Sequence, residues 1–166
     1  MARKFRGTEA VKVDAKGRMS IPAKFRRVFE AGDPDFQNGG KPQIVIVYGP
    51  EDWQMLHLYT IEAADEIDAE IDRLPRASLE REWLEELMNG QADTAEIDTE
   101  GRLVLPQKLR QKIGIEDGAI LTARGDKLVL WANEETSEAH KSRLAEYQQQ
   151  HGPGFDPLSL AGQVGG

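Results

Sequence analysis

The sequence of 166 residues contains no cysteine, which excludes a disulfide framework, a thiolate zinc site and a cysteine nucleophile. Its three histidines, His57, His140 and His151, lie far apart and show none of the short spacings of metal-binding histidines. We therefore expect no metal site with histidine or cysteine ligands, and no cofactor. A site built from carboxylates alone is left open.

Long apolar runs are also missing, because stretches such as Ile44–Tyr48 are far shorter than the ~20 residues of a membrane-spanning helix. No apolar segment follows the basic residues of the N-terminus, so we expect no secretory signal. Neither the nucleophile elbow G-x-S-x-G nor a phosphate-binding glycine loop is present. These absences predict a cytoplasmic protein that is not an enzyme and has no membrane partner.

Acidic residues outnumber basic ones, and the two kinds are unevenly distributed along the chain. The net charge is −8, yet residues 1–30 hold nine Lys and Arg against three Asp and Glu. Residues 51–90 hold three basic side chains against twelve acidic ones. This asymmetry is typical of a phosphate-binding face that is backed by an acidic, solvated face.

The clearest signal is an internal repeat. Residues 11–26 align without gaps on residues 95–110, and six of the sixteen aligned pairs are identical, whereas chance gives about one. The identical pairs are Asp14/Asp98, Gly17/Gly101, Arg18/Arg102, Pro22/Pro106, Lys24/Lys108 and Arg26/Arg110. The chain therefore contains two copies of one structural unit.

Each copy has the pattern of a strand, a turn, a second strand and a helix. Val11 and Val13 alternate with polar residues, as in a half-buried strand. In the Asp-x-x-Gly-Arg sequence that follows, we expect Asp14 and Gly17, like Asp98 and Gly101, to form and cap a tight turn. A proline then stands where a helix can begin.

Helical and turn-rich segments complete the expected domain order. We expect a first repeat over residues 5–60, a helical connecting segment over 61–90, a second repeat over 91–133 and a C-terminal helix over 134–149. The connecting segment has two amphipathic stretches, 61–74 and 79–88. Residues 150–166 are rich in glycine and proline without periodicity, which predicts a disordered tail.

The stretch from Asp14 to Arg26 resembles the AbrB/SpoVT family of bacterial DNA-binding regulators, and the two copies resemble its tandem-repeat branch. The resemblance covers residues 5 to about 145. It implies an α+β, mainly β fold, in which two swapped-hairpin repeats form one β-barrel with flanking helices. It further implies a ring-like homo-oligomer that binds short direct repeats in double-stranded promoter DNA, regulates a division and cell-wall gene cluster, and is associated with the nucleoid.

The basic side chains of the two copies are the candidate DNA-binding residues. Arg18 and Arg102 follow the turn glycines, and each is expected either to pair with its turn aspartate or to contact DNA, where an arginine fork suits guanine. The full candidate set is Lys12, Lys16, Arg18, Lys24, Arg26, Arg27, Arg102, Lys108 and Arg110. Because Glu96 and Glu100 replace Lys12 and Lys16 in the second copy, that copy should contribute less to DNA affinity.

Other side chains fit structural roles better. We expect Trp53, Trp83 and Trp131 to pack in the core or in an interface, and the acidic stretch 62–72 to be a solvated helix face. The main alternative function is an antitoxin-like or assembly protein that uses the same fold to bind another protein. Co-purification of a toxin would favour that alternative.

Overall fold

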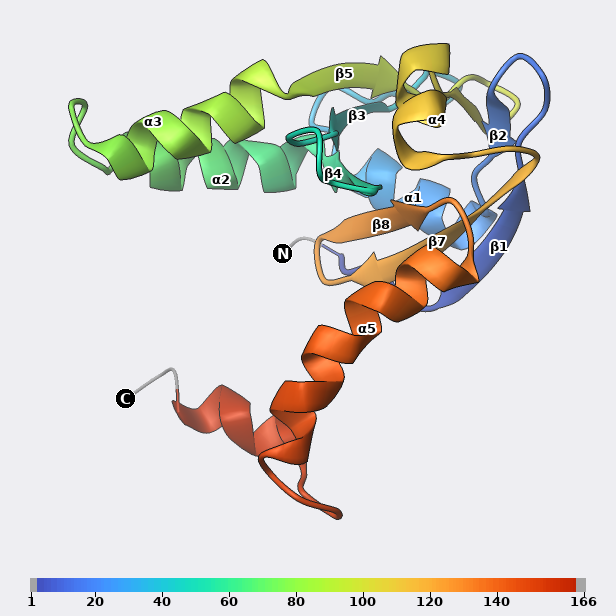
Figure 1. Ribbon diagram of the computed structural model, residues 1–166. Helices are drawn as coiled ribbons and strands as arrows, with labels where there is room; N and C mark the ends of the chain where they lie inside the picture. The colour runs from blue at the N-terminus through green and yellow to red at the C-terminus, as the bar shows by residue number, and fades with distance from the viewer. Residues whose placement is uncertain (1–2, 164–166) are drawn as a thin grey trace. The chain divides into compact units, whose positions relative to one another are not determined.

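A computed structural model of the chain describes residues 3–163, apart from the side chains of 140–143 and 162–163. The chain forms two compact units, one ending at Glu134 and the other starting at Glu135 (Figure 1). The first unit contains both sequence repeats and the connecting helices.

The elements follow the same order in both repeats. The first repeat contains β1 (Thr8–Lys12), β2 (Arg18–Ser20), α1 (Ala23–Ala31), β3 (Gln43–Val47) and β4 (Met55–Thr60), and α2 (Ile61–Asp72) follows it. The second contains β5 (Ala92–Glu96), β6 (Arg102–Val104), α4 (Gln107–Ile113), β7 (Gly118–Arg124) and β8 (Lys127–Trp131), and α5 (Glu134–Gln149) follows it. Between them, α3 (Leu79–Glu85) continues into a short π-helix, Glu86–Gly90.

The strands of the two repeats are interleaved. One six-stranded antiparallel sheet has the order β1-β7-β8-β4-β3-β5, and β2 pairs with β6 in a separate two-stranded sheet. Each repeat therefore places its first strand against the third strand of the other, because β1 pairs with β7 and β5 with β3. The strands β5, β7 and β8 of the second repeat are the equivalents of β1, β3 and β4 of the first. Exchanging each strand for its equivalent reverses the strand order, so the two repeats are related by an approximate two-fold axis between β8 and β4.

The α+β class expected from the sequence is confirmed. The six longer strands form one continuous hydrogen-bonded sheet, and the two short strands form a second sheet. The single closed barrel stays a prediction.

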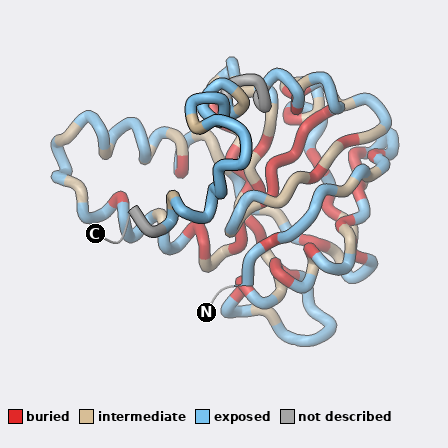
Figure 2. Tube along the Cα trace, turned by 90° about the horizontal axis from the view of Figure 1, so that it is seen from below, coloured by how far each residue is buried: buried red, intermediate tan, exposed pale blue. Residues whose placement is uncertain are grey.

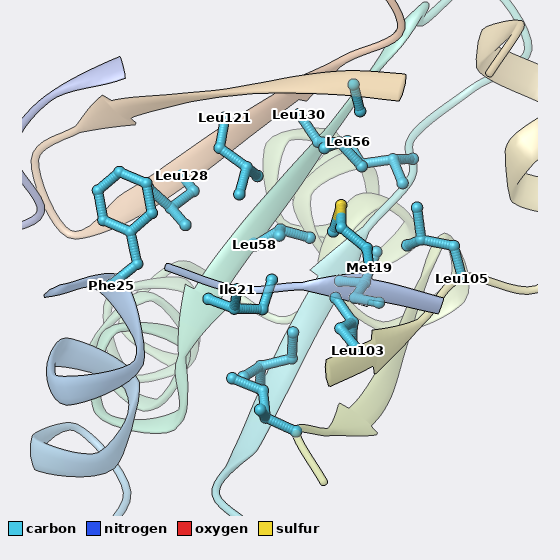
Figure 3. Close-up of a cluster of buried hydrophobic side chains, with 14 of the residues drawn as sticks. Met19, Ile21, Phe25, Leu56, Leu58, Leu103, Leu105, Leu121, Leu128 and Leu130 are labelled. Carbon is cyan, nitrogen blue, oxygen red and sulfur yellow. The ribbon is translucent and has the colours of Figure 1, made fainter. Parts of the chain in front are cut away.

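Both repeats share one hydrophobic core. Its largest fully buried side chains include Met19 and Ile21 from the first repeat and Leu103 and Leu105 from the second. Figure 3 shows these four pointing toward one another among leucines of β4, β7 and β8. Since each β2–β6 residue pair alternates inward and outward, Met19 and Leu103 fill the core while their neighbours face away from it.

The connecting segment folds into a helical hairpin of α2 and α3, as the amphipathic stretches predict (Figure 1). Thr60 and Ser78 cap the two helices by accepting hydrogen bonds from backbone amides. The base of the hairpin packs in a second apolar cluster that includes Tyr59, Ile71 and Met88. Its outer part is exposed, as the pale blue helical turns in Figure 2 show.

The three tryptophans do not share one environment. Trp131 is buried in β8, and Trp53 is partly buried against the second cluster. Trp83 is 76% exposed on α3, so of the two expected environments the core does not apply to it and packing in an interface stays a prediction. Trp83 is exposed because α3, the shorter helix of the hairpin, has no buried residue, and its apolar side is not covered by another element of the first unit.

The C-terminal unit contains a second short helix beyond α5. Residues Pro157–Gln163 form a 3-10 helix, and the ring of His151 stacks on Phe155 and contacts Tyr147 edge-on. The disorder expected for residues 150–166 stays a prediction. Residues 164–166, which the same expectation included, lie outside the described residues.

Candidate nucleic-acid interface

Two equivalent turns carry the candidate DNA-reading arginines. In the first, one oxygen of the Asp14 carboxylate accepts the backbone amides of Lys16 at 3.0 Å and Arg18 at 2.9 Å. Gly17 has φ of +84°, a conformation that side chains with a Cβ rarely adopt. In this geometry the Asp14 carboxylate accepts the turn amides, and Gly17 supplies the positive φ that the turn requires.

The side chain of Arg18 returns to the same aspartate. Its Nε lies 2.6 Å from Asp14 Oδ2, and the two side chains are 39% and 41% exposed. The ion pair uses Nε only, which leaves both terminal nitrogens of the guanidinium free of Asp14. Arg18 is thus held at Nε, while its two terminal nitrogens, here called the tip of the side chain, remain open. These terminal nitrogens are the part of an arginine that makes paired contacts to a base edge.

The second turn has the same backbone and a different charge environment. Asp98 Oδ1 accepts the amides of Glu100 and Arg102, each at 2.9 Å, and Gly101 has φ of +82°. The Arg102 guanidinium lies 3.7 Å from Asp98 and is also hydrogen-bonded through a terminal nitrogen to the Glu100 carboxylate. Its tip is therefore occupied by a carboxylate of its own turn.

The two arginines lie on one surface. Within the β2–β6 sheet, Arg18 pairs with Val104 and Arg102 pairs with Ser20. These four residues alternate with the buried Met19 and Leu103, so they share the outward face. We call this outward face, made of Arg18, Ser20, Arg102 and Val104, the β-ribbon face.

Three other candidate residues of the first repeat are open to solvent. Lys12, Lys16 and Arg27 are exposed, and no carboxylate of the described chain forms an ion pair with any of them. Lys24 is less available, since its ammonium lies 2.7 Å from Glu9 and above the ring of Phe25. In the second repeat, Lys108 is exposed.

Arg26 and Arg110 differ from the other basic candidates because each is half-buried and tied to the backbone. Arg26 Nε donates to the Ile21 carbonyl at 2.9 Å, and Arg110 Nε donates to the Leu105 carbonyl at 3.0 Å. These two arginines have a structural contact that the count of basic residues could not reveal.

The turn hydrogen bonds hold the pKa of both aspartates below the usual range. For Asp14 the amide and guanidinium of Arg18 have the largest effect, and for Asp98 the amide of Arg102 does. A depressed pKa stabilises the fold above the pKa of the unfolded state, and this contribution disappears as the pH falls through the folded-state pKa. Both turns should therefore loosen only in acid.

We expect the carboxyl carbons of Asp14 and Asp98 to titrate below about 3.9, the ordinary aspartate value, in a carbon-13 NMR experiment. Asp68 is the matched control, because burial and the neighbouring Asp65 and Asp72 raise its pKa. Titration of Asp14 and Asp98 at or above the ordinary value would show that the two caps do not form in solution.

Two features of the interface were missed in the sequence. The Glu100–Arg102 ion pair could have been suspected, because side chains two residues apart meet in a tight turn. The outward position of Val104, which is 50% exposed, follows from counting two residues on from Arg102 along the strand.

The surface thus combines an arginine with a free tip, a narrow two-stranded ribbon and nearby unpaired cations. No helix within residues 3–163 is long and apolar enough to cross a bilayer. Among the side chains that the structure describes, no cluster of His, Asp and Glu is arranged to hold a metal ion. The arrangement is suited to binding a polyanion with a readable edge.

Comparison with known proteins points to one family. A family model described as "MraZ protein, putative antitoxin-like" matches residues 4–74 and 88–149. The chain is 48% identical to the Transcriptional regulator MraZ of Ruegeria pomeroyi over 166 residues, which cover the whole chain and 99% of the relative. It is 41% identical to the protein of that name from Cereibacter sphaeroides, with 99% of each chain covered. The Marinomonas protein of that name is 32% identical over 86% of this chain and 89% of its own.

Proposed function

This chain belongs to the MraZ family, and from that membership we propose that it is a transcriptional regulator that binds double-stranded DNA sequence-specifically. The observation that carries the proposal is the β-ribbon face with its pair of Asp-x-x-Gly-Arg turns. In this role the protein acts on the nucleoid in the cytoplasm and catalyses no reaction.

The shape of the ribbon supports binding in the major groove. A two-stranded β-ribbon fits the major groove of B-DNA, where every base pair presents a distinct pattern of donors and acceptors. Arg18 projects from this ribbon with its terminal nitrogens free of Asp14, the geometry needed for a paired contact to guanine. Val104 adds an exposed apolar group beside it, which suits the methyl group of thymine.

The remaining cations supply affinity without sequence information. Lys12 precedes the first turn, Lys16 lies in it, Arg27 lies on α1, and all three are exposed and free to contact phosphates. In the second repeat, Glu96 is bonded to Gln43 and lies 3.7 Å from Lys41, and Glu100 occupies the tip of Arg102. The two repeats therefore contribute unequally, and the first one dominates.

The function is tested by fluorescence anisotropy with a labelled duplex from the region upstream of the protein's own gene. A scrambled duplex of equal composition is the control, and both are titrated at several salt concentrations. We expect the upstream duplex to bind about a thousandfold more tightly. Equal affinity for the two duplexes would overturn the proposal of sequence-specific binding.

Self-assembly into a ring-like homo-oligomer is the second part of the proposal. The apolar side chains of α3 support it, because Leu79 and Trp83 are 77% and 76% exposed and Leu84 is 39% exposed. A contiguous exposed apolar patch on a soluble protein is a typical mark of a protein contact surface. Several chains on neighbouring repeats of one DNA molecule would raise the affinity above that of a single chain.

We predict that light scattering detects an assembly larger than a dimer at micromolar concentration. Trp83→Glu should reduce its mass, since it places a charge in the contact and removes no core packing. Glu82→Gln, on the same helix, is the control and should leave the mass unchanged. A parent protein that is monomeric at this concentration would contradict the prediction.

A further inference from the structure

Arg26 and Arg110 stand at equivalent positions in α1 and α4, and each crosses to the turn of the other repeat. A Cβ added to Gly17 would lie 2.8 Å from Nε of Arg110. A Cβ added to Gly101 would lie 2.7 Å from Nη1 of Arg26. Real Cβ atoms essentially never approach other atoms this closely, so each guanidinium packs directly on the turn glycine of the opposite repeat.

Backbone hydrogen bonds follow the same crossed pattern. The Gly17 carbonyl accepts the amide of Leu105 at 2.8 Å, and the Gly101 carbonyl accepts the amide of Ile21 at 2.9 Å. Arg110 adds a third contact, because one of its terminal nitrogens donates to the Ala15 carbonyl at 3.3 Å. The turn of the first repeat is thus held from outside by the strand end and helix of the second.

Each guanidinium is also bonded to the backbone of its own repeat. Nε of Arg110 donates to the Leu105 carbonyl, and Nε of Arg26 donates to the Ile21 carbonyl. The planar fork of arginine can bond in two directions at once, which the single ammonium of lysine cannot reproduce in this geometry. Arg110 therefore links its own strand end to the loop that carries Arg18.

The orientation of Arg18 depends on that loop. Its amide and its Nε both bond to Asp14, so Arg18 moves with the turn. This loop is contacted by Arg110, which donates a hydrogen bond to the Ala15 carbonyl and packs on Gly17.

We infer that Arg110 and Arg26 are reciprocal positioning residues: Arg110 fixes the turn that presents Arg18, and Arg26 fixes the turn that presents Arg102. The inference rests on the proposed function for its consequence on DNA binding. It assigns to these two arginines a role across the repeats in place of an independent phosphate contact.

The test is a double-mutant cycle on DNA affinity, measured with the labelled upstream duplex. Arg110→Ala should weaken binding by about fivefold or more when Arg18 is present, and by less than about twofold in the Arg18→Ala chain. Arg26→Ala is the matched control, and its effect should be the same with and without Arg18. A general loss of stability would not produce this difference between the two backgrounds.

Arg110→Lys separates positioning from charge. The variant keeps the positive charge, so a phosphate contact would survive and the salt dependence would stay the same. If Arg110 acts through its fork, Arg110→Lys should weaken binding nearly as much as Arg110→Ala. Near-parental binding by Arg110→Lys would overturn the inference.

Amide hydrogen exchange reads the same contacts without DNA. Arg110→Ala should speed exchange at the amides of Lys16 and Arg18 while leaving those of Glu100 and Arg102 near the parental rates, and Arg26→Ala should do the reverse. Equal acceleration at both turns, or at neither, would overturn the crossed arrangement. A parent protein that binds no DNA would refute the proposed function, and the exchange pattern would still decide the inference.

Discussion

Arg18→Ala is expected to lower affinity for the upstream duplex by about tenfold to a hundredfold, the loss of one paired contact to a base. The protein should remain folded and assembled, because the Arg18 side chain is 39% exposed and bonds only to the exposed Asp14. Affinity for the scrambled duplex should fall much less, since the change removes a reading group and only one charge.

The matched control is Arg102→Ala, the same change at the equivalent position. We expect a smaller loss, because the Arg102 tip is bonded to Glu100 and would have to leave that carboxylate before it could contact a base. Circular dichroism and light scattering must show both variants to be intact. Binding by Arg18→Ala within twofold of the parent would mean that Arg18 has only its structural role with Asp14.

The second large effect is expected from reversing two charges, Lys12→Glu together with Lys16→Glu, which copies the second repeat into the first. The slope of log affinity against log salt is negative, and each lost phosphate contact should reduce its magnitude by about 0.9, so the pair should make it shallower by about 1.8. Binding to the upstream and scrambled duplexes should weaken in parallel. The core should be unaffected, because both lysines are exposed.

The reverse exchange, Glu96→Lys together with Glu100→Lys, is the control. It should strengthen binding to both duplexes, and Glu100→Lys should also free the tip of Arg102. Lys41 lies near Glu96, so part of the gain at that position is offset by repulsion between two lysines. An unchanged salt slope in both exchanged proteins would show that local charge at the turns does not set DNA affinity.

Much of the architecture could be predicted from the sequence. The sixteen-residue repeat predicts two equivalent turns, and the structure has two turns in which Asp14 and Asp98 accept the amides of Arg18 and Arg102. The helical hairpin follows from the spacing of its apolar residues. Such features depend on neighbours within a few positions along the chain, which is the range over which a sequence pattern is informative.

The features that could not be predicted depend on contacts between distant residues. Arg26 and Arg110 look like two more surface cations, and only the pairing of β2 with β6 brings each beside the opposite turn glycine. The exposure of Trp83 depends on how far α3 extends beyond its neighbours. The occupied tip of Arg102 depends on the rotamer of Glu100.

The interleaved strand order has a consequence for biosynthesis. Thr8 in β1 pairs with Thr122 in β7, and both strands of the first turn contact the second repeat. At about 5–20 residues per second, a ribosome needs several seconds or more to make the intervening chain. Throughout that interval the first repeat has no partner for its leading strand. The first repeat is then an intermediate whose unpaired strand edges can bind other chains. The two repeats must therefore reach their native state together at the end of translation.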